Sequence, residues 1–231
     1  MAAIALVVGA GSSKAAEIDF GALTPSPGGC THATGDEGLV CANSQTFTAN
    51  GSTYTATGFS NAFTTATALT LKPLTGSPLG PPFNSLGESG LGENGSAPPS
   101  ACTDTSSIHD CEIAGTASVG LVSNHLITDA IIGSVQPGEN FNFFTGSSIA
   151  TLTQLGGTIV GGSCTEFDAT ADTCLITGFS ALAIGVQSAG TGDVLLTAVS
   201  TPEPASLALL GTALAGLGFL RRRRNPVTAA R

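Results

Sequence analysis

The sequence contains no tryptophan, one tyrosine and one methionine, and it has seven basic residues against sixteen acidic ones. Five of the basic residues lie in the C-terminal tail and one, Lys14, lies near the start, so Lys72 is the only basic residue between Ala16 and Pro204. All sixteen acids fall in that interval, which gives it a formal charge of −15. Phosphate backbones and anionic lipids would repel such a surface, because binding to them requires lysine and arginine. We therefore expect no nucleic acid partner.

The chain also lacks the usual signatures of catalysis. No G-x-S-x-G stands between a strand and a helix, and His32, His109 and His125 have no evident triad partners. A glycosidase would need two carboxylates about 5 to 9.5 Å apart, which the sequence does not indicate for any pair of acids. We therefore expect no enzymatic activity. A secreted hydrolase ranks third, after the two functions given at the end of this section.

Long helix-forming stretches are missing from the middle of the chain, whereas glycine (31) and proline (12) are abundant. Serine, threonine and asparagine separate short apolar runs, a composition that favours strands and turns. The central 16–200 region is long enough for one domain with a substantial core. We predict an all-β fold here, an antiparallel β-sandwich of jelly-roll-like type.

The clearest local structure is SQTFTANGSTYTATGF, residues 44–59, in which two alternating threonine-rich strands meet at Asn50-Gly51. This dipeptide suits the type I′ turn of a β-hairpin, and Phe47 and Tyr54 should lie on its buried face. The proline-rich segment 73–107 is expected to be a long surface loop. Further strands are expected at residues 64–72, 112–123, 125–135, 140–146, 148–161, 174–188 and 193–200.

The N-terminal residues have the character of a secretory leader. An apolar run from Ala2 to Ala10 precedes Ser13-Lys14-Ala15, a small-x-small pattern that suits signal peptidase. We predict a signal peptide over residues 1–15 and cleavage after Ala15. Because no basic segment precedes the apolar run, we expect a longer leader upstream.

The C-terminal segment 201–231 has three parts in a meaningful order. Pro202-Glu203-Pro204 precedes an uncharged, largely apolar run over 205–220. Apolar residues cover every face of a helix here, which predicts a C-terminal transmembrane helix of about 24 Å, shorter than a typical hydrocarbon core. A cationic cluster directly after the helix places this end in the cytoplasm and the body across the membrane. The cluster consists of Arg221, Arg222, Arg223 and Arg224.

This order of elements resembles the PEP-CTERM sorting signal, and the resemblance is limited to the tail. It implies export through the inner membrane, recognition of Pro202, Glu203 and Pro204 by an exosortase, and cleavage near this motif. The protein would then be released or held at the cell surface. The family is linked to exopolysaccharide and biofilm production, which implies an extracellular polysaccharide as a further partner.

Six cysteines fall at short, similar spacings, although six cysteines permit fifteen pairings. Pairing between neighbours is the simplest, and each bond would contribute about 2 to 3 kcal/mol and fit an oxidising compartment. A zinc site is not expected, because no C-x₂-C spacing occurs and the histidines are not arranged in ligand pairs. The predicted pairs are Cys30 with Cys41, Cys102 with Cys111, and Cys164 with Cys174.

Acidic residues gather in or beside these cysteine loops. Two or three carboxylates and some backbone carbonyls of one loop could bind calcium weakly, although no EF-hand or other calcium repeat supports this. Solvated loop acids are the simpler interpretation, so we expect no cofactor, with calcium as the alternative. The candidate ligands are Asp104, Asp110, Glu112, Glu166, Asp168 and Asp172.

These features favour a non-enzymatic structural protein, exported and sorted by an exosortase and associated with exopolysaccharide or biofilm matrix. Its partners during sorting are the exosortase and the inner membrane, and its final location is the cell surface or the extracellular space. The alternative is a calcium-dependent glycan-binding module. Few aromatic side chains are available as platforms for sugars, which weakens that alternative.

Overall fold

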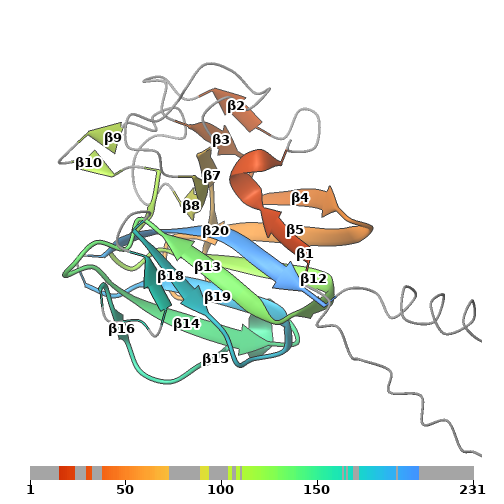
Figure 1. The fold of residues 1–231 in the computed structure, drawn as a ribbon. Coiled ribbons are helices and arrows are strands. Elements are labelled where there is room, and N and C mark those ends of the chain that lie inside the picture. Colours follow the sequence, from red (N-terminus) through yellow and green to blue (C-terminus); the bar gives the residue numbers. More distant parts are fainter. Residues whose placement is uncertain are drawn as a thin grey trace, which may run out of the picture. The chain divides into compact units, whose positions relative to one another are not determined.

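A computed structural model of the chain describes its β-rich body (Figure 1). Among the described residues, a compact unit spans Ala16–Thr201 and contains twenty strands and two short 3-10 helices. No described helix is long and apolar enough to cross a membrane. The predicted signal peptide and the helix predicted over 205–220 lie outside the described residues. The structure describes residues 16–23, 30–32, 38–72, 89–93, 104–105, 108–109, 111–162, 164, 166–168, 172–190 and 192–202.

The first of the two large sheets has ten antiparallel strands, with β20 near its centre. Besides its neighbours in the main order, β20 also pairs with β1 (Ala16–Asp19), which continues into helix η1 (Phe20–Ala22), and with β11 (Ile113–Ala114). The main order is β17 (Glu166–Asp168), β18 (Thr173–Ile176), β13 (Asp129–Gly133), β20 (Asp193–Thr201), β8 (Gly90–Glu93), β7 (Leu69–Lys72), β3 (Leu39–Cys41) and β2 (Cys30–His32).

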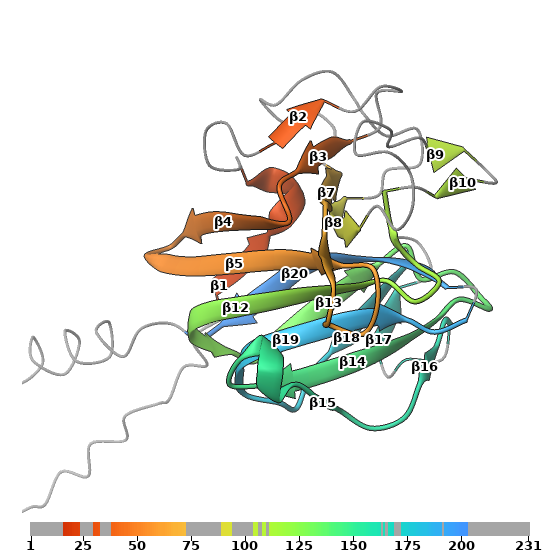
Figure 2. The ribbon, with the colours of Figure 1, turned by 180° about the vertical axis from the view of Figure 1, so that it is seen from behind.

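The second large sheet has eight antiparallel strands, and Figure 2 shows it from the other side of the body. Strand β16 (Ile159–Val160) pairs with β14, β6 (Ala66–Thr67) pairs with β5, and helix η2 (Ile149–Thr151) follows β14. A separate two-stranded ladder consists of β9 (Asp104–Thr105) and β10 (Ile108–His109). The main order is β15 (Thr153–Gln154), β14 (Asn140–Gly146), β19 (Ala181–Ser188), β12 (Ser118–Ile127), β5 (Ser52–Phe59) and β4 (Ser44–Ala49).

The core contains side chains from both large sheets. Leu121 and Phe143 come from the eight-stranded sheet, Ile132 and Leu196 come from the ten-stranded sheet, and all four are fully buried in one cluster. Two antiparallel sheets with almost no helix confirm the prediction of an all-β sandwich.

The hairpin of residues 44–59 forms as predicted. Strands β4 and β5 are joined by Asn50 (φ 52°) and Gly51 (φ 77°), and positive φ at both positions is what a type I′ turn requires. Phe47 lies directly opposite Tyr54, and both rings are buried. Both pack edge-on against Phe20, at centroid distances of 5.6 Å and 6.3 Å.

Several segments predicted as single strands divide between the two sheets. Within residues 64–72, β6 belongs to one sheet and β7 to the other, and Ala68 lies between the two strands. Residues 174–188 likewise form β18 and β19. The sequence does not indicate that the chain passes from one sheet to the other within such a segment. A strand that is apolar on the core side has the same pattern in either sheet.

Two predictions about local structure are wrong. The segment 148–161 contains helix η2 and two short strands rather than one long strand. The loop predicted over 73–107 contains β8, whose four residues are all buried in the ten-stranded sheet. The glycines of β8 allow close packing rather than turns. A Cβ at Gly92 would overlap the carbonyl group of Cys111.

Candidate functional site

The end of β20 leads directly into the predicted sorting segment. Thr201 is its last residue, is 4% exposed and pairs with Ala16 of β1. Pro202 follows, is exposed, and cannot extend the ladder because proline has no backbone N–H. The remaining predicted sorting residues, Glu203, Pro204 and the arginine cluster, lie outside the described residues.

The cysteines that the structure describes are disulfide-bonded. Cys30 is bonded to Cys41, its direct partner in the register of β2 and β3, and Cys164 is bonded to Cys174, which confirms two of the predicted pairs. Cys111 is also disulfide-bonded. Its predicted partner, Cys102, lies outside the described residues.

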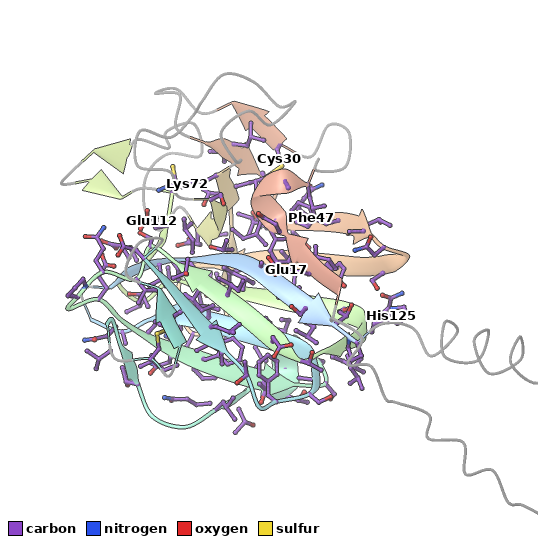
Figure 3. All side chains as sticks on the ribbon, in the orientation of Figure 1. Glu17, Cys30, Phe47, Lys72, Glu112 and His125 are labelled. Atoms are coloured by element: carbon purple, nitrogen blue, oxygen red, sulfur yellow. A yellow bond between two sulfur atoms is a disulfide. The ribbon has the colours of Figure 1, made fainter. Side chains whose placement is uncertain are left out.

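A group of buried polar contacts joins β7 and the segment before β11. Lys72 Nζ donates to Glu112 Oε1 at 2.5 Å, and both residues are labelled in Figure 3. Ser134 Oγ donates to Glu112 Oε2 at 3.0 Å. Thr70 Oγ1 of β7 donates to the Cys111 carbonyl at 2.8 Å. The Lys72 and Glu112 side chains are 1% and 0% exposed. This ion pair was not predicted; the one available indication was a lone lysine in an apolar strand.

A second buried acid, Glu93, lies at the end of β8 opposite Leu69 of β7. Its side chain is 1% exposed, and neither carboxylate oxygen has a hydrogen-bond partner. Loss of hydration on burial raises the pKa of Glu93 to about 7. The Thr67 hydroxyl lowers that pKa slightly but does not reach hydrogen-bond geometry. Glu93 is therefore protonated over part of the neutral range.

The candidate calcium ligands do not form a cluster among the described residues, where no group of three or more His, Cys, Asp or Glu side chains could hold a metal ion. Glu112 is engaged by Lys72 and Ser134 instead of lying on a solvated loop. Asp172 is described, and its carbonyl accepts a hydrogen bond from Val135 N at 2.9 Å. The remaining candidate ligands lie outside the described part of the structure: Asp110 as a whole, and Asp104, Glu166 and Asp168 in their side chains.

A groove of about 370 Å³ lies between the 155–160 segment and β18. The aliphatic surface comes from Leu155, Val160 and Ile176, and the hydroxyl groups come from Thr158 and Thr177. None of the described lining side chains is charged. The Thr158 hydroxyl donates to Asn142 Oδ1 at 2.8 Å, which fixes one wall. The described lining therefore offers neutral packing surface and hydroxyl groups.

A disulfide-bonded all-β body followed directly by a C-terminal sorting segment is the organisation of an exported protein. The family model of the PEP-CTERM protein-sorting motif matches residues 200–224, so the chain carries this signal. The motif implies processing by an exosortase, export through a membrane-associated sorting step and a surface or extracellular fate. Among curated proteins and solved structures, none matches the chain.

Proposed function

We propose that the protein is a non-enzymatic structural component of the cell surface or extracellular matrix, associated with exopolysaccharide after sorting by an exosortase. The observation that carries the proposal is the sorting motif at residues 200–224, which begins in the last residues of β20. The sorting signal therefore follows the last strand of the body along the chain without an intervening linker.

The chemistry of the body supports an extracellular role. Disulfides at Cys30–Cys41 and Cys164–Cys174 suit an oxidising compartment and stabilise a domain outside the cell. The one lysine of the acidic region is buried against Glu112, so it does not offset the exposed acids. Such a surface stays soluble and attracts cations, including those that bridge acidic polysaccharides.

The sorting step is tested by the intact mass of the protein from its host, with and without the exosortase. We expect the wild type to lose its tail and appear at the surface or in the medium, and the Glu203→Ala variant to stay full length in the membrane fraction. Glu17→Ala changes an exposed acid outside the motif and should be sorted like the wild type. Equal processing of the wild type with and without the exosortase would contradict the proposal.

The structural role is tested separately from sorting. Matrix material from a strain lacking the protein should retain less polysaccharide at the cell surface, and the wild-type gene should restore it. Melting temperature in millimolar calcium should stay unchanged, because a bound ligand would raise it. A rise that a chelator reverses would favour the glycan-binding module over the inert matrix protein.

A further inference from the structure

The buried ion pair of Lys72 and Glu112 brings a potential nucleophile and a carboxyl group together. Lys72 Nζ lies 2.5 Å from Glu112 Oε1, and the two side chains are 1% and 0% exposed. One carbon–oxygen bond of about 1.2 Å joins Oε1 to the carboxyl carbon, so Nζ lies within about 3.7 Å of that carbon. This is close to the separation of about 3 to 3.5 Å from which well-placed groups react.

The backbones that carry the two groups are fixed. Lys72 is the last residue of β7, inside the ten-stranded sheet. Cys111, directly before Glu112, is disulfide-bonded, and its carbonyl accepts a hydrogen bond from Thr70 Oγ1 at 2.8 Å. Ile113, directly after Glu112, is fully buried in β11, which pairs with β20. The Glu112 carboxyl group is therefore held against Lys72 by a backbone that is anchored on both sides.

Burial also changes the chemistry of the pair. In water an ammonium and a carboxylate are well hydrated ions that do not condense, but inside a protein both charges lose their hydration. Transfer of one proton from Nζ to the carboxylate then costs less than in water and leaves a neutral amine, which is a nucleophile. The Ser134 hydroxyl, on a residue 2% exposed, donates to Glu112 Oε2 at 3.0 Å. It is placed to stabilise negative charge that develops on this oxygen when the amine attacks.

We propose that Lys72 and Glu112 condense to an intramolecular amide after the chain folds. The folded chain first reaches the ion pair, in which one ammonium proton passes to Glu112 Oε1. The nitrogen lone pair then bonds to the carboxyl carbon, and the bond from this carbon to Oε1 breaks. Oε1 leaves as water with a second proton from the nitrogen, and the last hydrogen stays on the amide nitrogen. The reaction consumes no oxidant, reductant or other reactant.

The amide gives the body a cross-link that reductants do not open. It joins residues 40 positions apart, whereas the two observed disulfides span 11 and 10 positions. A longer closed loop restricts the unfolded chain more strongly. The inference goes beyond the proposed function and does not depend on sorting by an exosortase, because both groups lie in the folded body.

The bond is tested by the intact mass of the purified full-length chain after reduction of its disulfides. Wild type refolded and kept at pH 7 should become lighter by the mass of one water molecule, and wild type kept in urea should not. Lys72→Arg is the matched control, because a guanidinium keeps the positive charge but supplies no free amine. This variant should keep its full mass. A refolded wild type that stays at full mass, or an equal loss in Lys72→Arg, would overturn the proposal.

The position of the amide is tested by digestion with glutamyl endopeptidase, which cuts after glutamates whose carboxyl group is free. In the lighter form of the protein, the bond between Glu112 and Ile113 should resist the enzyme. The peptide that contains Lys72 should remain joined to the peptide that contains Glu112, which mass spectrometry of the fragments detects. Cleavage after Glu112 in the lighter form, or an amide from Lys72 to another acid, would overturn the assignment.

The positioning role of Ser134 is tested by the rate at which the refolded chain loses water. Ser134→Ala should slow this loss several-fold, because it removes the hydrogen bond to Glu112 Oε2. Ser188→Ala is the matched control, since Ser188 is also buried, at 3% exposed, and its hydroxyl donates to the Gly192 carbonyl instead. It should lose water at the wild-type rate. Equal rates in the two variants would overturn the role of Ser134.

Discussion

Lys72 and Glu112, forty positions apart in the sequence, form an ion pair inside the body, with Nζ and Oε1 2.5 Å apart. Lys72 is the only basic residue between Ala16 and Pro204. Its burial means that the one positive charge of this region stabilises an interior contact between β7 and the segment before β11. Lys72 therefore does not lie on the surface among the exposed acids.

Replacing Lys72 by methionine should destabilise the protein by about 3 to 5 kcal/mol, because it leaves the Glu112 carboxylate buried without its counter-charge. Urea unfolding at pH 7 measures this loss. The double variant Lys72→Met with Glu112→Gln should recover a large part of it, because no uncompensated charge is then buried. A single variant as stable as the wild type would contradict the buried ion pair.

Glu93 should make the protein less stable as the pH rises through neutrality. Its folded-state pKa is raised to about 7 from 4.5, so its contribution is fully present below pH 4.5 and is lost as the pH rises through 7. The difference corresponds to roughly 3 kcal/mol at high pH. Glu93→Gln should therefore be the more stable protein at pH 8 and differ little at pH 4.

Unfolding by urea across this pH range measures the effect of Glu93. Thr48→Ser, at an exposed position of β4, supplies the control, because it neither adds nor removes an ionisable group. A Glu93→Gln variant that loses stability between pH 4 and pH 8 as steeply as the wild type would show that another group causes the dependence.

The two observed disulfides should contribute similarly to stability. They close loops of similar length, with separations of 11 residues for Cys30–Cys41 and 10 for Cys164–Cys174. The chain-entropy estimate gives about 2 to 3 kcal/mol for each. Paired replacement of either set by alanine should lower the unfolding free energy by this amount under oxidising conditions. A variant with unchanged stability would argue against the corresponding bond.

Gly51 and Gly157 should respond differently to alanine, although a methyl group added at either Cα would meet open space. Gly51 has a φ of 77°, so Gly51→Ala should cost about 1 kcal/mol by straining the type I′ turn. Gly157 has no positive φ, and Gly157→Ala should be neutral or slightly stabilising. Thermal unfolding compares them, and equal effects would argue against the assigned turn.

Some features of the protein follow from short stretches of sequence. The 44–59 hairpin was predictable because Asn50-Gly51 and the alternating threonines act within sixteen neighbouring residues. The sorting segment was predictable for the same reason, since its motif, apolar run and arginines are contiguous. Two local disulfides were also confirmed, because their short spacings favoured neighbour pairing.

Other features depend on contacts between distant parts of the chain. The sequence alone indicated neither the division of residues 64–72 between two sheets nor the incorporation of β8, because apolar and glycine patterns do not specify which layer a strand joins.

The sequence by itself determined the sorting signal of the protein, its acidity and its all-β class, because these depend on composition and contiguous motifs. Only the tertiary structure decided that Lys72 pairs with Glu112, that Glu93 is buried without a partner, and that Ala16 lies opposite Thr201. These relationships depend on burial and strand register, which arise only when remote segments pack together.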